Sequence, residues 1–402
     1  MAMLSVAEAL ERVLAQAQPL PAEEAPLEQA DGRVLAFDLE SRRTQPPADV
    51  SAMDGYAVRS ADAAAAPVRL KIIGEVAAGR PFAAAVGPGE TARIFTGGVL
   101  PQGADTVVIQ EVTKREGEFV SIEKPTSKGR HVRVLGLDFR SGDTLLAKGR
   151  RLTARDLQLA AGMNHPLLPV HRRPKLALFA TGDELVPPGM EPGPGQIVYS
   201  NGFALAALAR AEGADVFDLG VIPDRLGETI AAIREARALS ADILVTTGGA
   251  SVGEYDLVQK ALSAEGMALS FWKIAMRPGR PLMHGRLGSM AVLGLPGNPV
   301  SSYVCAFLFL VPLIRRLCGR SDLIAPTESA VLGCDLPEND ERADYLRSAL
   351  TEGPNGPVAT PFPTQDSSMM APLAKADCLL IREPHAPPAK AGTSCVVIRL
   401  AQ

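Results

Sequence analysis

An apolar run without polar alternation marks the middle of the chain. Residues 243–247 read Ile-Leu-Val-Thr-Thr and are followed by Gly248 and Gly249. A short apolar, β-branched run of this kind is typical of a parallel strand covered on both faces. The glycine pair lets the backbone turn sharply at the carboxyl end of the strand, where open α/β sheets bind their ligands. The stretch predicts a ligand-binding edge, and an ordinary strand-to-helix turn explains it equally well.

Residues 174–325 extend this pattern, with β-rich runs that alternate with helical runs. The helical runs begin at Asn201, Leu226 and Leu257, and each follows an apolar run. Strands and helices in alternation predict a doubly wound, parallel sheet. Residues 300–318 then supply a closing helix. We therefore predict an α/β domain over this part of the chain.

The chain before this domain has a different pattern. Ser5 and Glu8 stand three residues apart among apolar residues at helical spacing, which predicts a capping box and a first amphipathic helix. Short β-rich runs with Gly and Pro punctuation fill residues 58–148 and predict a small all-β module. Thr153 precedes a helical run that ends at Gly162, and we expect this helix to pack with the first one.

Residues after Pro326 again read as short strands with many prolines, which predicts a second β module. Four regions follow from these patterns. We predict residues 1–45 together with 146–173 as an N-terminal linker domain with helices, 46–145 as a β-rich domain, 174–325 as the α/β domain and 326–402 as the C-terminal β domain.

Composition narrows the class of protein. A chain of 402 residues exceeds one usual core, so several domains are expected. Its 47% hydrophobic and 21% charged residues are those of a soluble globular protein, and a net charge of −4 gives no general attraction to nucleic acid or membrane. The longest apolar run, residues 304–313, contains Pro312 and is too short to span a bilayer. The five cysteines lack metal-ligand spacing and the N-terminus lacks a signal-peptide pattern, so the cytoplasm is the expected location.

Acidic residues follow the predicted parallel strands at their carboxyl ends. These residues are Asp183, Glu184, Asp224, Glu254 and Asp256. Because successive carboxyl ends share one edge of a doubly wound sheet, we expect the five carboxylates to gather there. Any one of them is more often a turn or cap residue, but five repelling carboxylates destabilise a fold unless a cation offsets them. No Cys or His cluster accompanies them, so Mg²⁺ is favoured over zinc.

Basic residues occur in a loop that follows another predicted strand. Lys273, Arg277 and Arg280 occupy three of eight positions beside glycine and proline. A phosphate or another oxyanion is the natural partner of such a cluster, and a solvated charged loop is the alternative. The turn from Gly294 to Pro299 leads into the closing helix, where backbone N–H groups can face an anion.

Several common catalytic motifs are absent from the sequence. It contains no Gly-x-Gly-x-x-Gly, no P-loop, no Ser/His/Asp pattern and no nucleophilic cysteine context, which argues against dinucleotide oxidoreductases, P-loop NTPases and hydrolases. Six other motifs, in their order along the chain, closely resemble the molybdopterin molybdenumtransferase family, known as MoeA in bacteria and as the gephyrin E domain in animals. They read PPADVSAMDGYAVR, RIFTGGVLPQGADTVVIQE, FATGDEL, TTGGASVGEYD, FWKIAMRPGRP and GLPGNPVS.

The resemblance runs from about Leu4 to the C-terminus and implies a fold and a reaction. The fold is a central sheet domain of the molybdopterin-binding type, flanked by an N-terminal β module with linker helices and a C-terminal small β-barrel-like module. The reaction is the Mg²⁺-dependent insertion of molybdate into adenylylated molybdopterin, which releases AMP and forms molybdenum cofactor. The TTGG-type motif alone is less specific, because it also resembles that of molybdopterin adenylyltransferases and of competence-damage-type amidases.

The resemblance also implies site residues. Those that match functional positions of the family are Asp54, Thr96, Glu184, Asp224, Asp256 and Lys273. Among them, Glu184, Asp224 and Asp256 are the expected Mg²⁺ ligands. The residues expected to contact the pterin nucleotide or molybdate are Gly248, Gly249, Ser251, Lys273, Arg277, Arg280, Pro296, Asn298 and Arg347.

This sequence departs from the family pattern at three positions. Arg277 and Arg280 stand where family members often have lysines, which keeps the charge but changes the geometry of an anion contact. Asp366 replaces the glycine of a family QGS segment, and no role is assigned to that segment.

Family members are elongated homodimers whose cleft takes residues from both subunits. By resemblance we expect a homodimer in which Asp54 and Thr96 complete the site in trans, and transient contact with other proteins of molybdenum cofactor biosynthesis. Two alternatives stay open. An adenylyltransferase that makes the precursor would need only the α/β domain, so the flanking β modules argue against it. A scaffold that binds a partner's peptide would not need Glu184, Asp224 and Asp256.

Overall fold

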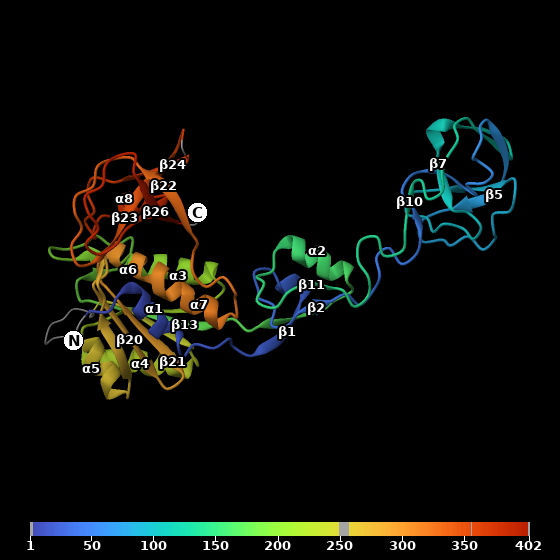
Figure 1. The fold of residues 1–402 in the computed structure, drawn as a ribbon. Helices are drawn as coiled ribbons and strands as arrows, with labels where there is room; N and C mark the ends of the chain where they lie inside the picture. The colour runs from blue at the N-terminus through green and yellow to red at the C-terminus, as the bar shows by residue number, and fades with distance from the viewer. Residues whose placement is uncertain (1–2, 249–256, 355, 401–402) are drawn as a thin grey trace.

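The computed structural model describes residues 3–248, 257–354 and 356–400. The described part of the chain is elongated, with a small β module at one end and the α/β domain at the other (Figure 1). A linker unit that carries one helix lies between them, and the C-terminal β module packs beside the α/β domain. The architecture therefore separates the residues of the N-terminal β module from those at the edge of the large sheet.

The first helix, α1 (Val6–Leu14), begins at the predicted capping box. The Glu8 N–H donates to Ser5 Oγ (3.2 Å), and the Ser5 N–H donates to the Glu8 carboxylate (2.8 Å). The helix buries Ala9 and Val13 against the closing helix of the α/β domain. The prediction that it packs with the helix near residue 154 is wrong, because its apolar face belongs to the core of the large domain.

The linker unit is built from two short strand pairs and one helix. Its helix begins with the N–H and hydroxyl of Thr153, which both donate to the Asp156 carboxylate (2.9 and 2.8 Å). Leu35, Leu152 and Met163 are buried in its small core. The elements are α2 (Ala154–Gly162), β1 (Ala22–Pro26) paired with β12 (Leu167–His171), β2 (Leu39–Glu40) paired with β11 (Thr144–Leu146), and η1 (Leu27–Gln29).

The N-terminal β module is a six-stranded sheet in the order β7-β4-β6-β5-β9-β8. Adjacent residues of its central strand face opposite cores: Tyr56 and Val58 lie in one, and Ala57 lies in the other. The strands are β4 (Gly55–Val58), β5 (Val68–Val76), β6 (Glu90–Ile94), β7 (Thr106–Ile109), β8 (Thr113–Glu116) and β9 (Phe119–Ile122), with β3 (Val50–Ser51) paired with β10 (Val132–Arg133) and η2 (Gln110–Val112) nearby.

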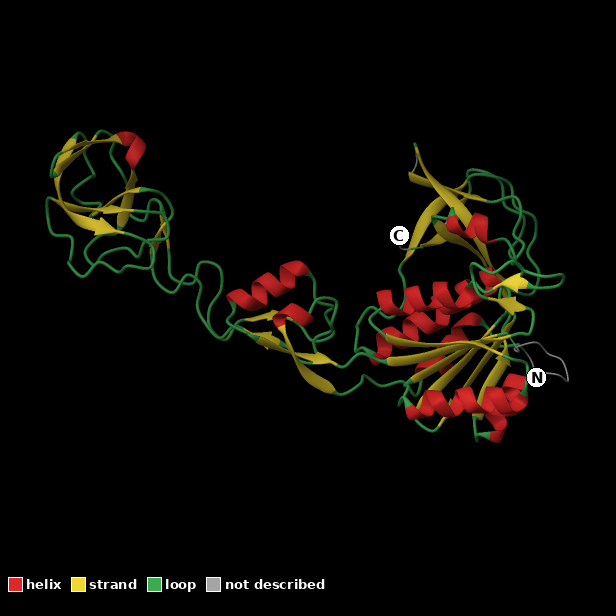
Figure 2. Cartoon of the chain, turned by 180° about the vertical axis from the view of Figure 1, so that it is seen from behind, coloured by secondary structure: helices red, strands yellow, loops and turns green. Residues whose placement is uncertain are grey.

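The α/β domain contains a six-stranded sheet in the order β16-β13-β17-β21-β20-β18. Its first four strands are parallel, and helices cover both faces (Figure 2). The strands are β13 (Lys175–Thr181), β16 (Asp215–Ile222), β17 (Ile243–Thr247), β18 (Ala268–Lys273), β20 (Pro281–Leu287) and β21 (Met290–Leu295), with the short pair β14 (Leu185–Val186) and β15 (Ile197–Val198). The helices are α3 (Asn201–Ala211), α4 (Leu226–Ala238), α5 (Leu257–Ala264), α6 (Pro299–Cys305), the π-helical η3 (Ala306–Leu310) and α7 (Val311–Leu317).

Burial explains the apolar run at β17. Ile243 and Val245 pack into the core under α1, α3 and α6, whereas Leu244 packs into the core on the other face, under α4 and α5. The predicted doubly wound sheet is confirmed, and β20 and β18 extend it in antiparallel order. The reason is local: Gly288 and Ser289 form a two-residue hairpin between β20 and β21.

The closing helix is long and apolar because it is a core helix. Residues 299–317 form one continuous helix, which is long and apolar enough to cross a membrane by composition, yet 78% of its most apolar window is buried inside the protein. Its neighbours are α1, α3 and the sheet, so burial within the domain accounts for its composition.

The C-terminal module is a closed barrel of five strands, β23-β24-β22-β26-β25, with β25 returning to β23. These are β22 (Thr327–Leu332), β23 (Ala343–Gly353), β24 (Gly356–Pro361), β25 (Cys378–Arg382) and β26 (Ser394–Arg399), with α8 (Met370–Ala374) between β24 and β25. The strand β19 (Met276–Arg277) leaves the α/β domain and pairs with β23. The barrel is thereby joined to the basic loop predicted to bind an anion.

One buried histidine makes the α/β domain sensitive to acid. His284 in β20 is 4% exposed, has no hydrogen-bond partner on either ring nitrogen among the described residues, and lies against Phe271 with ring centroids 5.4 Å apart. Burial lowers the pKa of His284 from 6.5 to about 4, with a smaller effect of Arg286. The unfolded chain therefore binds a proton between pH 6.5 and 4 that the folded chain does not bind, so folding weakens as pH falls through this range.

We expect His284→Phe to remove this loss. On acidification to pH 4 the wild type should lose about 3 kcal/mol more of its unfolding free energy than the variant does. Urea unfolding followed by the fluorescence of Trp272, the one tryptophan of the chain, measures this in the α/β domain. His385→Asn, at an exposed histidine of the barrel, is the control. An equal pH dependence in wild type and His284→Phe would contradict the prediction.

Candidate functional site

Acidic side chains gather at the carboxyl edge of the parallel sheet. Asp183 and Glu184 follow β13, Asp224 follows β16, and the Asp224 N–H donates to Asp183 Oδ1 (3.1 Å). Burial raises the pKa of Asp224, and repulsion from Asp183 and Glu184 raises it further, against a lowering by the hydrogen bond with Asp183. The structure therefore brings these three carboxylates together, as the strand order predicted. Glu254 and Asp256, the other two predicted members, lie outside the described residues.

Glycines allow the two central strands to end close together. Gly248 follows β17 with φ of +82°, and an added Cβ would lie 2.4 Å from the carbonyl oxygen of Thr181 at the end of β13. Gly182 has φ of +151°, and a Cβ there would lie 2.7 Å from the carboxylate of Glu184. Gly248 needs glycine because a side chain there would push against the backbone at the end of β13, and Gly182 favours glycine because of its positive φ. Gly249 and Ser251 lie outside the described residues.

The metal site stays a prediction. Within residues 3–248, 257–354 and 356–400, no group of three or more His, Cys, Asp or Glu side chains is arranged to hold a metal ion. Glu184 and Asp224 supply carboxylate oxygens, which are the donors that Mg²⁺ prefers, and the third predicted ligand, Asp256, is in the undescribed stretch. The described residues thus contain part of the predicted ligand set.

The three cations of the basic loop have different environments. Arg277 donates through Nε to Asp344 Oδ1 (2.7 Å), pairs with the same carboxylate through Nη2, and contacts Asp340 through Nη1 (3.3 Å). These carboxylates, Asp344 first, raise the pKa of Arg277. Lys273 and Arg280 are exposed, and neither forms an ion pair within the described part of the chain. Two cations are therefore available to an anion, while Arg277 binds the barrel.

The basic loop rests on the closing helix. The Ile274 N–H donates to the Arg280 carbonyl (3.1 Å), which holds the two ends of the loop together. Gly279 has φ of +112°, and a Cβ there would lie 2.4 Å from Cys305 Sγ in α6. Lys273 and Arg280 consequently project from one tight loop beside the start of that helix.

Arg347 lies inside the junction between the barrel and the α/β domain. Its side chain is 1% exposed, donates through Nη1 to the Met369 carbonyl (3.0 Å) and through Nε to Gln365 Oε1 (3.3 Å), and leaves Nη2 buried without a partner in the described residues. Burial lowers the pKa of Arg347, although an arginine remains charged. Such a buried donor without a described partner calls for a further occupant, such as a water molecule or an anion.

The loop that Arg347 holds reaches the start of α6. Asn298 donates its side-chain amide to Ser367 Oγ (2.8 Å), and the Val300 N–H donates to the Ser367 carbonyl (3.0 Å). The Val300 N–H, one of the backbone donors predicted to face an anion, is therefore hydrogen-bonded to the barrel instead. Pro296 is buried at the end of β21, while Asn298 is exposed. Sequence reasoning missed Ser367, although its position in the QDSS segment was the available signal.

Asp54 and Thr96 form a hydrogen-bonded pair on the N-terminal β module. The N–H and the hydroxyl of Thr96 both donate to Asp54 Oδ1 (2.8 Å each), and these bonds lower the pKa of Asp54. The adjoining Gly55 cannot carry a side chain, since a Cβ would lie 2.0 Å from the Val108 carbonyl oxygen. The guanidinium of Arg93 stacks over Tyr56 at 5.1 Å. Neighbouring strands therefore fix this carboxylate in its ionised form.

The two groups of predicted residues lie far apart within one chain. Asp54 precedes β4 at one end of the molecule, and Asp224 lies at the sheet edge at the other end (Figure 1). A single chain does not bring the pair of Asp54 and Thr96 to the acidic edge.

Models of known protein families match most of this chain. Three family models match in order: "MoeA N-terminal region (domain I and II)" over residues 4–163, "Probable molybdopterin binding domain" over 177–316 and "MoeA C-terminal region (domain IV)" over 329–400. The chain belongs to the MoeA family. The fold expected from the resemblance is confirmed.

Similar proteins share this organisation along their length. The molybdopterin molybdenumtransferase of Haemophilus influenzae is 33% identical over 399 residues, which cover 98% of each chain, and that of Nostoc sp. is 39% identical over 80% of this chain and 75% of the relative. The crystal structure of a molybdopterin biosynthesis MoeA protein from Pyrococcus horikoshii superposes with a TM-score of 0.85 at 32% identity and covers all of both chains. The linker unit and both β modules are thus MoeA features.

The pair of Asp54 and Thr96 yields a measurable prediction. We expect Thr96→Val to raise the pKa of Asp54 part of the way to its ordinary value, because the hydroxyl donor is lost while the backbone N–H remains. A carboxyl ¹³C NMR titration, with the Asp54 signal assigned by its loss in Asp54→Asn, measures the shift. Thr113→Val, which removes a hydroxyl that donates to the Gln110 carbonyl, should leave it unchanged. An unaltered titration in Thr96→Val would count against the geometry.

Proposed function

We propose that this protein is a molybdopterin molybdenumtransferase, which inserts molybdate into adenylylated molybdopterin, releases AMP and forms molybdenum cofactor. The observation that carries the proposal is its alignment with the enzyme of that name from Haemophilus influenzae over 98% of both chains. The carboxylates that follow β13 and β16 and the basic loop that follows β18 lie on the same sheet, and they support the same reaction because a substrate with a pyrophosphate needs both cations and a metal site.

The acidic edge is the proposed Mg²⁺ site. Glu184, Asp224 and Asp256 would hold the ion, and its fit rests on their hard oxygen donors; the pKa of Asp224 is raised by burial first and then by the nearby charges of Asp183 and Glu184, which a cation would offset. When bound, Mg²⁺ neutralises charge on the pyrophosphate. The carboxylates would hold the ion at the sheet edge, and the cations of the basic loop would hold the pyrophosphate. No protein nucleophile is needed, because water or a molybdate oxygen attacks phosphorus while the bridging P–O bond of the pyrophosphate breaks and AMP leaves.

The basic residues have three different roles in this proposal. Lys273 and Arg280, which are exposed and unpaired among the described residues, bind the phosphates of the pterin nucleotide. Arg347 binds molybdate through its orphaned Nη2 donor, beside the Ser367 loop. Arg277 contributes by fixing the basic loop to Asp344 instead of by direct contact. Electrostatic interactions of this kind are expected to contribute most of the rate enhancement in phosphoryl transfer.

A homodimer completes the proposed site. In this proposal Asp54 and Thr96 reach the acidic edge of the partner subunit, and the elongated shape of the chain supports it. We further propose a cytoplasmic enzyme that contacts other proteins of molybdenum cofactor biosynthesis transiently to receive the pterin.

An assay of AMP release tests the function. Purified protein with adenylylated molybdopterin, Mg²⁺ and molybdate should release AMP and form the metal-bound pterin, and EDTA should abolish the reaction. Asp224→Asn should lower the rate about 100-fold by removing charge at the metal site. Asp215→Asn, at the opposite end of strand β16, is the matched control and should keep the wild-type rate. AMP no higher than in a no-protein control would exclude the function, and adenylylation by ATP would indicate the adenylyltransferase instead.

A complementation experiment tests the site in trans. Asp54→Ala and Asp224→Asn each inactivate the enzyme alone, whereas coexpressed chains with different tags should regain about a quarter of wild-type activity, because half of the dimers are mixed and each has one intact site. Affinity purification through both tags isolates the mixed dimer. Absence of recovery in a purified mixed dimer would show that the two residues do not form one site in trans.

A further inference from the structure

A small cavity lies in the N-terminal β module, at the opposite end of the molecule from the acidic sheet edge (Figure 1). Its volume is about 260 Å³, which is below the range of about 300–1,000 Å³ that is usual for drug-sized ligands. One side comes from β7 and η2, and the other comes from the loop of residues 124–131. The side chains of the first side are apolar: Val107, Val108, Ile109 and Val112. The cavity therefore suits a small ligand.

The lining of this cavity carries positive charge. Lys124 and Arg130 are exposed, and neither forms an ion pair within the described part of the chain. None of the described residues that line the cavity is acidic, and the neighbouring Glu123 already pairs with Lys114 (2.7 Å). Two cations without a counter-ion beside an apolar wall favour an anionic occupant, because a wall of low polarity strengthens their field.

Two neutral groups in the same lining can donate hydrogen bonds. The hydroxyl oxygen of Thr126 is buried and has no partner among the described residues. Arg130 Nε donates to His131 Nε2 (3.2 Å), so the neutral imidazole carries its proton on Nδ1 and can donate it. Because buried polar groups are rarely left unpaired, an acceptor is expected beside Thr126. Together with the two cations, these donors form a set that fits the oxygens of an oxyanion.

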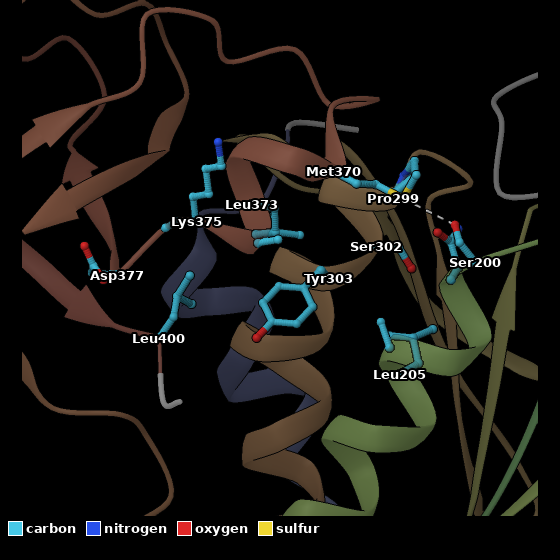
Figure 3. A pocket seen from close by; sticks show the side chains of 14 residues that line it. Ser200, Leu205, Pro299, Ser302, Tyr303, Met370, Leu373, Lys375, Asp377 and Leu400 are labelled. Atoms are coloured by element: carbon cyan, nitrogen blue, oxygen red, sulfur yellow. Dashed lines mark hydrogen bonds between the residues drawn. The ribbon is translucent and has the colours of Figure 1, made fainter.

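The cavity between the α/β domain and the C-terminal barrel has a different character. Its volume is about 470 Å³, and Leu205 and Tyr303 of the helices face Leu373 of α8 across it (Figure 3). The charged residues of its lining are one cation, Lys375, and one carboxylate, Asp377. This cavity therefore gives no preference for an anion, whereas the cavity of the N-terminal module does.

Backbone hydrogen bonds hold the loop of residues 124–131 in place. The Val107 N–H donates to the Arg130 carbonyl (3.0 Å), which fixes the loop to β7. The Ala52 N–H donates to the His131 carbonyl (2.9 Å), two residues before Asp54. The donors of the cavity are therefore preorganised, and the loop that carries them also supports the turn of Asp54.

We propose that this cavity is an oxyanion site of the N-terminal β module, which binds a tetrahedral dianion of the phosphate, sulfate or molybdate type. The anion lies between Lys124 and Arg130 and accepts hydrogen bonds from the Thr126 hydroxyl and the His131 ring. Its binding stabilises the loop that supports the turn of Asp54. The site goes beyond the proposed function and does not depend on it.

Titration of the full-length protein with inorganic phosphate at constant pH tests the proposal. The chain has five histidines, so their ring signals can be followed by NMR. We expect the His131 signal, assigned by its loss in His131→Asn, to shift and to saturate, because the anion binds beside the ring. The signal of His385, an exposed histidine of the barrel, should not move. Potassium chloride at the same ionic strength measures the general effect of salt.

Charge variants show whether the two cations bind the anion. Lys124→Gln/Arg130→Gln should raise the phosphate Kd measured at His131 at least about tenfold, because two charge-assisted contacts are lost. Lys71→Gln/Arg80→Gln is the matched control: it changes the net charge equally, at exposed positions of the same module outside the lining, and should keep the wild-type Kd.

A hydroxyl variant and competing anions complete the test. Thr126→Val should weaken phosphate binding about threefold and leave the melting temperature in phosphate-free buffer unchanged, because the lost hydroxyl has no described protein partner. Sulfate and molybdate should each shift the His131 signal, and the anion with the lowest Kd is the preferred ligand.

Three outcomes would overturn the proposal. The first is a His131 signal that responds alike to phosphate and chloride, without saturation. The second is an equal phosphate Kd in the wild type and Lys124→Gln/Arg130→Gln. The third is saturation at other histidines alone, which would place the anion elsewhere. AMP release is measured separately, so an active enzyme without the His131 response refutes the oxyanion site alone, and an inactive protein with that response refutes the transferase function alone.

Discussion

The two central parallel strands, covered on both faces, leave little room for charged side chains along their length, and the rest of the site depends on this constraint. Ile243, Leu244 and Val245 are completely buried between two layers of helices. Acidic residues consequently follow the strands at their carboxyl ends, where the chain turns into the next helix. Asp183, Glu184 and Asp224 crowd there because neighbouring strands end at the same edge. The repulsion among these carboxylates is a consequence of the fold, and it is the reason that a cation is proposed at this edge.

The contact between the barrel and the α/β domain organises the positive side of the site. Arg277 is bound by Asp344, and the Ser367 loop occupies part of the amino end of α6. These two interactions occupy the Arg277 guanidinium and a backbone N–H at the start of α6, which the sequence had suggested as contacts for an anion. They leave Lys273 and Arg280 on a tight loop, and a buried donor of Arg347 within the barrel without a partner among the described residues. The junction therefore holds the two domains together and also carries residues of the proposed site. It encloses the cavity beside α3 and α6.

The elongated arrangement divides the functional residues between distant modules. In the N-terminal module, Thr96 holds Asp54 as a carboxylate, on a strand start that tolerates only glycine next to it. This half-buried carboxylate has no described partner from the sheet edge of its own chain. The proposed site, built from both modules, would therefore need a second copy of the chain.

The sequence by itself determined the elements and their order. Hydrophobic periodicity, the capping box at Ser5 and the glycines at the strand ends act between near neighbours, so they predicted the doubly wound sheet, both β modules and the acidic edge. The six ordered motifs identified the family for the same reason, since they are local segments. Only the tertiary structure decided that α1 packs on the α/β domain, that Arg277 pairs with Asp344 and that Arg347 is buried with a free donor. Those outcomes depend on contacts between residues far apart in the chain, and composition and spacing carry no information about which partner a charged side chain meets across a domain junction.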